Sequence, residues 1–148
     1  MTDQAEYDQD FFLWSRAQAD ALRVAARSGA NLPVDWENVA EEIESLGRSD
    51  RRELASRLRV IMEHLLKLRS SAATEPRGGW IDTVLRERSD VAGLLQQSPS
   101  LHREVPALID GERRAARRIV ANARARFGEA LADEPELTEE QVLGDWLP

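Results

Sequence analysis

The strongest constraint in this sequence is the spacing of apolar residues between positions 54 and 68. They recur at intervals of four and three residues: Leu54, Leu58, Ile61, Leu65 and Leu68. This period places all five on one face of a helix, and Met62 and Leu66 widen that face. We therefore expect a helix here with a buried apolar face, and we expect it to be the central helix of the fold.

The other long segments show the same period. Alanine and leucine are abundant, and no stretch alternates apolar and polar residues for long enough to indicate a strand. The sequence therefore predicts an all-α fold, a single-domain bundle over residues 1–148 with four to five main helices and a short C-terminal helix.

Capping residues and glycines divide the first half of the chain into three expected helices. One runs from near residues 8–10 to Gly29. The next is capped by Asp35 and closed by Gly47, and the central helix starts at Ser49. We expect the first two helices to face the core through Phe11, Trp14, Leu22 and Ala25, and through Trp36, Val39, Ala40, Ile43 and Leu46.

In the second half, residues 70–79 are predicted to be a loop, and the fourth helix is predicted to run from near Ile81 to Ser98. We expect Ser98 to cap the following segment, in which Pro106 must either kink or split the helix. Its expected apolar face comprises Leu101, Val105, Leu108, Ala115, Ile119, Ala123 and Phe127. A capping-box pattern at residues 138–141 predicts the short terminal helix, ending near Gly144, with Trp146 and Leu147 docked after it.

Composition excludes several classes of function. The absence of cysteine excludes disulfides and thiolate zinc sites, and no apolar run approaches the roughly 18 residues of a membrane span. The first ten residues are acidic, unlike a signal peptide, so we expect a cytoplasmic protein with no membrane partner. The net charge of −7 disfavours general nucleic-acid binding.

Several segments resemble one bacterial family. The core of the resemblance is residues 41–52, EEIESLGRSDRR, followed by residues 56–67. Residues 7–14, 98–101 and 145–148 are similar to other parts of the same family, which is called domain of unknown function 29. Membership implies an all-helical, single-domain protein, and it implies no catalytic residue, cofactor or substrate.

Carboxylates and an imidazole are the side chains from which a metal site in a helical bundle is built. Glu42 and Glu44 flank the apolar stripe of the second expected helix, and His64 lies at the edge of the third. These three are the candidate metal ligands, and a metal-dependent enzyme is one alternative function. The interpretation we favour is a solvated helix edge with a hydrogen-bonded histidine.

The sequence indicates no class of enzyme and no cofactor. It has only two histidines, His64 and His102, and neither a Gly-x-Ser-x-Gly elbow nor a glycine-rich phosphate loop. Apart from the metal-dependent alternative, no enzyme is indicated, and an enzyme is not the function that we favour.

Residues 112–127 carry a net charge of +5, and residues 128–148 carry seven acidic residues and no basic one. The arginines of this basic face are Arg113, Arg114, Arg117, Arg118, Arg124 and Arg126. They could bind nucleic acid, a second alternative, but no interleaved aromatic residue is present to stack on bases. We expect the acidic segment to pair with them instead, within the chain or between subunits. The function we expect is a structural or protein-interaction module that self-associates as a homo-oligomer.

Overall fold

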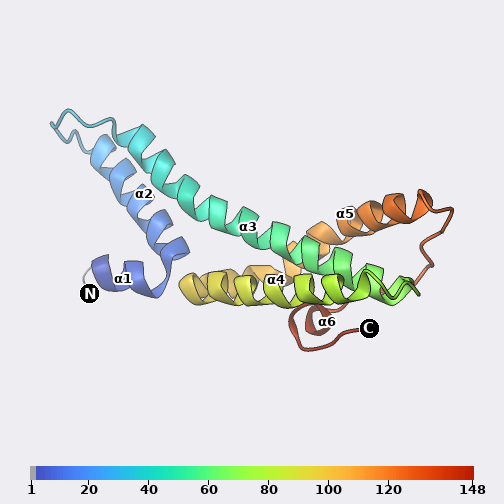
Figure 1. The fold of residues 1–148 in the computed structure, drawn as a ribbon. Helices are drawn as coiled ribbons and strands as arrows, with labels where there is room; N and C mark the ends of the chain where they lie inside the picture. The colour runs from blue at the N-terminus through green and yellow to red at the C-terminus, as the bar shows by residue number, and fades with distance from the viewer. Residues whose placement is uncertain (1–2) are drawn as a thin grey trace. The chain divides into compact units, whose positions relative to one another are not determined.

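The computed structural model describes residues 3–148, with side chains from Glu6 onward, and all the regular structure in this range is helical. Figure 1 shows the elements in chain order. They are α1 (Asp3–Gln9), α2 (Phe11–Arg27), α3 (Trp36–Ser70), α4 (Arg77–Gln97), the 3-10 helix η1 (Pro99–Glu104), α5 (Val105–Ala125) and α6 (Glu139–Leu143). The predicted all-α class is confirmed.

The chain contacts group into two compact units. The first unit comprises the residues up to Glu53 together with Leu94–Arg103, and the second comprises Leu54–Gly93 and Glu104–Pro148. The expectation of a single domain over the whole chain stays a prediction.

In the first unit, α2 packs closely against the N-terminal half of α3. A Cβ atom added to Gly47 would lie 2.3 Å from Oγ of Ser15 and 3.2 Å from a ring carbon of Phe12. The prediction that Gly47 ends a helix and that Ser49 caps the next is therefore wrong, because α3 continues through both. Glycine serves here to let two helices approach, without the positive φ of a helix C-cap.

Residues at the starts of α2 and η1 cap each other. The Asp10 carboxylate accepts hydrogen bonds from the Leu13 amide (2.9 Å) and from the amide (2.6 Å) and hydroxyl (2.9 Å) of Ser100. In return, the Ser98 hydroxyl accepts a hydrogen bond from the Phe12 amide at 3.1 Å. Asp10 is confirmed as the cap of α2. Ser98 lies directly before η1 as predicted, and its carbonyl oxygen accepts a hydrogen bond from the Leu101 amide at 3.0 Å, but its hydroxyl bonds to α2 instead. We call this set of bonds the reciprocal cap.

The second unit contains the predicted central stripe of α3. Its apolar residues from Leu54 to Leu68 are almost completely buried, which confirms the prediction. Buried apolar residues on α4 and α5 complete this core: Val84, Val91, Val105, Leu108, Ile109, Ala116 and Val120.

Two predicted boundaries change in this half of the chain. Helix α4 begins at Arg77 rather than near Ile81, so the loop is shorter than expected and Gly78 and Gly79 are helical. Pro106 splits the predicted fifth helix, because it lies in the first turn of α5, directly after η1. There the missing proline amide removes no intrahelical hydrogen bond.

The face of α5 was predicted correctly only at its start. Ala116 and Val120 are buried, whereas Ile119 is exposed and Phe127, beyond the end of the helix, is 82% exposed. Apolar residues are adjacent at positions 115–116 and 119–120, so the period alone admits either face.

The C-terminal helix forms as predicted. Thr138 and Gln141 make both hydrogen bonds of a capping box, and Gly144 follows the last turn. Arg88 of α4 holds this end through its guanidinium, which donates to the carbonyl oxygens of Gln141, Val142 and Trp146 at 2.7–2.9 Å. None of the helices within residues 3–148 is both long and apolar enough to cross a membrane.

Candidate functional site

Arginines of α5 contact the acidic segment that follows it. The ion pairs join Arg113 to Glu136, Arg117 to Asp133 and Arg124 to Glu129, with nitrogen–oxygen distances of 3.6, 3.9 and 2.8 Å. The predicted pairing of the acidic segment with the basic face therefore occurs within one chain. Three other arginines of this face have no ion-pair partner within residues 3–148: Arg114, Arg118 and Arg126.

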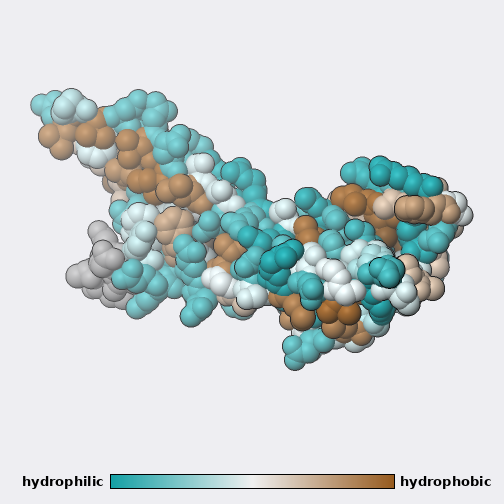
Figure 2. Space-filling model, in the orientation of Figure 1, coloured by the Kyte–Doolittle hydropathy of each residue, from teal (hydrophilic) through white to brown (hydrophobic). Residues whose placement is uncertain are grey.

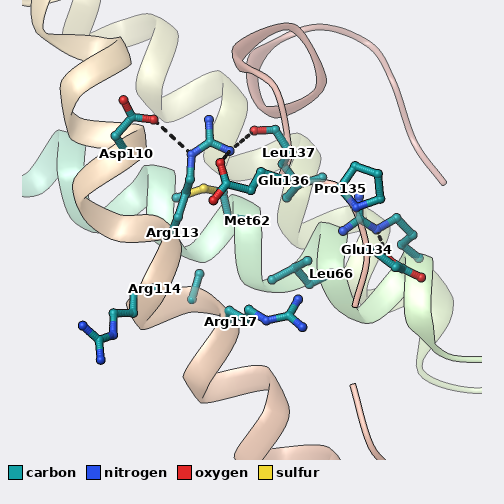
Figure 3. A pocket seen from close by; sticks show the side chains of 12 residues that line it. Met62, Leu66, Asp110, Arg113, Arg114, Arg117, Glu134, Pro135, Glu136 and Leu137 are labelled. Atoms are coloured by element: carbon teal, nitrogen blue, oxygen red, sulfur yellow. Dashed lines mark hydrogen bonds and ion pairs between the residues drawn. The ribbon is translucent and has the colours of Figure 1, made fainter. Parts of the chain in front are cut away.

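A cavity of about 560 Å³ lies between α3, α5 and residues 134–137 (Figure 3). We call it the arginine cavity. Its polar lining comprises four arginines and three acidic residues: Arg69, Arg113, Arg114, Arg117, Asp110, Glu134 and Glu136. Its remaining lining is apolar: Met62, Leu66, Ala116, Pro135 and Leu137.

The wall formed by residues 134–137 is held in place by charge-assisted bonds and one buried side chain. Arg113 donates to the Leu137 carbonyl oxygen and, at 3.1 Å, to the Asp110 carboxylate. Arg69 of α3 pairs with Glu134. The Leu137 side chain is buried, so it anchors this irregular segment.

In the first unit, Arg23 of α2 pairs with acidic residues of α3. Its guanidinium is 2.8 Å from the Glu44 carboxylate and 3.4 Å from that of Glu41. Arg48 lies 3.4 Å from the same Glu44 carboxylate. The hydrogen bond from Arg23 lowers the pKa of Glu44, and the neighbouring arginine charges act in the same direction. The Glu44 carboxylate is therefore already paired with two arginines.

The candidate metal ligands do not form a cluster in this structure. Glu42 and Glu44 share the single helix α3 with His64, so the premise of two consecutive helices is wrong. Glu42 is exposed, and Nδ1 of His64 lies 2.8 Å from the Val60 carbonyl oxygen. Within residues 3–148, no group of three or more His, Cys, Asp or Glu side chains is arranged to hold a metal ion. Metal binding by these residues stays an untested prediction. The other histidine, His102, lies exposed on η1.

Among the apolar residues predicted to face the core on α2 and on the first part of α3, only Ala40 is completely buried, and the others are partly buried or exposed. At 100° per residue, they lie on the side of the α2–α3 hairpin away from Arg23 and its carboxylates. Tyr7, Phe11 and Trp14 form an aromatic cluster with ring-centroid distances of 4.8–5.9 Å. On α3, Leu46 is 53% exposed and Val39 is also exposed.

We call this surface the hairpin face, with the members Tyr7, Phe11, Trp14, Val39, Ile43 and Leu46. Figure 2 shows hydrophobic residues along the α2–α3 hairpin. The two helices also carry small buried residues, Ser15 and Ala19 on α2 and Ala40 and Gly47 on α3, and Ser15 and Phe12 lie close to Gly47.

The sequence profile of the family described as Domain of unknown function DUF29 matches residues 6–147. The chain belongs to this family. It is also similar to an alpha-helical protein of unknown function from Rhodospirillum rubrum, whose crystal structure has been solved. The two are 28% identical with a TM-score of 0.77, and the match covers 94% of this chain and 89% of that one. A comparison with curated proteins gave no match.

The segments that resemble the DUF29 family have structural roles in this member. Gly47 lies where α2 and α3 approach closely, and residues 10 and 98–100 contribute to the reciprocal cap. The contribution of α3 to the arginine cavity was missed, because it depends on which helices pack together. The only signal in the sequence was the acidic segment directly after the basic one.

Proposed function

We propose that this DUF29 protein is a helical protein-interaction module that self-associates, and that its hairpin face binds the same face of a second copy. The observation that carries the proposal is the exposure of Tyr7, Val39 and Leu46 on the hairpin face, beside the partly accessible Phe11, Trp14 and Ile43. Large contiguous apolar surfaces are uncommon on monomeric proteins and mark interaction sites. The aromatic cluster adds side chains that are enriched in protein interfaces.

The charges on the hairpin favour a second copy over a partner of opposite charge. Arg23 and Arg48 on the other side are already paired with Glu41 and Glu44. The members of the hairpin face carry no charge at neutral pH, so a partner must offer an apolar surface too. A second copy supplies one, and a two-fold dimer places identical patches against each other.

Replacing Leu46 with glutamine tests this proposal. In a two-fold dimer the change removes two apolar contacts, so we expect the dimer dissociation constant to rise about tenfold or more, since tenfold corresponds to about 1.4 kcal/mol. Sedimentation-velocity measurements over a range of concentrations determine that constant for the wild type and the variant.

Leu85→Gln is the matched control, because Leu85 is 51% exposed on α4 and lies outside the hairpin face. We expect it to associate like the wild type, and circular dichroism checks that both variants stay helical. The proposal is overturned if the wild type is monomeric at all concentrations, if Leu46→Gln leaves association unchanged, or if Leu85→Gln weakens it equally.

A further inference from the structure

The arginine cavity combines two kinds of surface. Met62 and Leu66 of α3, Ala116 of α5 and Leu137 provide the apolar part, and guanidinium groups provide the charged part. Its volume of about 560 Å³ is within the range of about 300–1,000 Å³ typical of small-molecule sites. A ligand that matches both surfaces has an apolar body and an anionic group.

The chain itself shows which anion these arginines accept. Arg69 binds the carboxylate of Glu134, and Arg113 lies 3.6 Å from that of Glu136. Planar guanidinium and carboxylate groups match in geometry and form paired hydrogen bonds. A carboxylate is therefore an anion that these arginines already pair with, and it is the anionic group of the ligand that we propose.

Arg114 is exposed and extends away from Leu66 in Figure 3, whereas Arg117 lies beside the apolar lining of the cavity and has unused donors. Among the described residues it makes one hydrogen bond, from Nη2 to the Ala132 carbonyl oxygen at 3.1 Å. Its only ion-pair partner there is Asp133, at 3.9 Å, whose side chain is fully exposed. A guanidinium has five N–H donors, so Arg117 can bind a further carboxylate. Figure 3 shows its side chain extending from α5 toward Leu66.

We propose that the arginine cavity binds a small amphiphilic carboxylate of the fatty-acid class. Arg117 binds the carboxylate, and the apolar body of the ligand lies against Met62, Leu66 and Leu137. The four arginines outnumber the three acidic residues of the lining, so the cavity favours an anion over a cation. This proposal is independent of self-association through the hairpin face.

Octanoate is the probe for this proposal, and its binding to the full chain is measured by isothermal titration calorimetry at low salt. We expect saturable binding of one octanoate per chain. Octanol lacks the charge and acetate lacks the apolar body, so each should bind at least about tenfold more weakly. Two-dimensional NMR with octanoate should shift signals of residues that line the cavity.

Arg117→Gln should weaken octanoate binding at least about tenfold. Arg118→Gln is the matched control, because the substitution removes the same charge from α5. Arg118 is exposed and does not line the cavity. This control should leave the affinity within about twofold of the wild type. The proposal is overturned if octanoate does not saturate, if octanol or acetate binds as tightly, or if the two variants lose affinity equally.

Discussion

At the scale of single residues, the missing side chain of Gly47 controls how closely α2 and α3 approach. Gly47→Ala should destabilise the protein by about 1–3 kcal/mol, the usual cost of overpacking, because the new methyl group meets Ser15 and Phe12. Urea unfolding followed by circular dichroism measures the change in the free energy of unfolding.

Gly111→Ala is the matched control, since Gly111 lies within α5 and an added Cβ there meets nothing within 4 Å. It should stabilise by about 0.5–1 kcal/mol, the helix propensity difference between alanine and glycine. Adding Ser15→Ala to Gly47→Ala removes the nearest clashing atom, the Ser15 hydroxyl oxygen, and should restore part of the lost free energy of unfolding. Equal stabilisation by both glycine replacements would show that the helices do not meet closely at Gly47.

Glycine also shows what the sequence could and could not predict. Gly29 was predicted to end a helix, and it follows α2 with a φ of +76°. Gly47 also follows an apolar stripe in the sequence, but it lies inside α3. Its role is to let α2 approach, and the sequence alone does not reveal which helix packs against it. Likewise Asp10 was identifiable as a cap of α2, whereas its bonds to Ser100 depend on a segment 90 residues away.

At the scale of elements, the C-terminal half of α3 carries the apolar stripe that best predicted the fold. Leu58 lies in that stripe and is completely buried. Leu58→Ala should therefore lower the free energy of unfolding by about 2–5 kcal/mol, because it removes buried methyl groups and leaves a cavity.

Leu85→Ala is the comparison, because half of this leucine is exposed on α4. Its cost should stay within about 0.5 kcal/mol, as for most surface substitutions. Thermal and urea unfolding of both variants provide the measurement. A cost near zero at Leu58 would contradict its place in the core.

Elements were predictable where a local signal was unambiguous. The capping box of α6 satisfies its own amides, so four residues sufficed to locate it. The buried face of α5 was not predictable past its first turns. The helical period is met equally well by Ala115 with Ile119 and by Ala116 with Val120. The stripe around Leu46 was correctly recognised as apolar, but not as exposed, since periodicity does not reveal what covers a face.

At the scale of the whole molecule, charge is divided into blocks that pair within the chain. Glu134 and Glu136 neutralise Arg69 and Arg113. The double variant Glu134→Gln and Glu136→Gln should therefore bind a heparin column more strongly at low salt, and should elute at a higher salt concentration than the wild type.

Glu139→Gln with Glu140→Gln is the matched control, because it changes the net charge equally. These two glutamates lie in the first turn of α6 and have no ion pair within residues 3–148. Retention should rise less for this control, and the difference should shrink as salt screens charges beyond roughly 8–10 Å. Equal retention of the two variants would show that net charge alone determines heparin binding.

The reciprocal cap has a consequence for how the chain folds during synthesis. Residues 10–12 leave the ribosome long before Ser98 and Ser100. The hydrogen bonds from the Phe12 amide to Ser98 and from the Ser100 amide to Asp10 therefore cannot form until residues 98–100 have been made. Closing a loop of nearly 90 residues costs entropy that local helix formation does not. The first unit is discontinuous in sequence, and its completion therefore comes after the whole of α4 has been made. A chain truncated before residue 98 should contain α2 and α3 and the local bond from Leu13 to Asp10, without the bonds to Ser98 and Ser100.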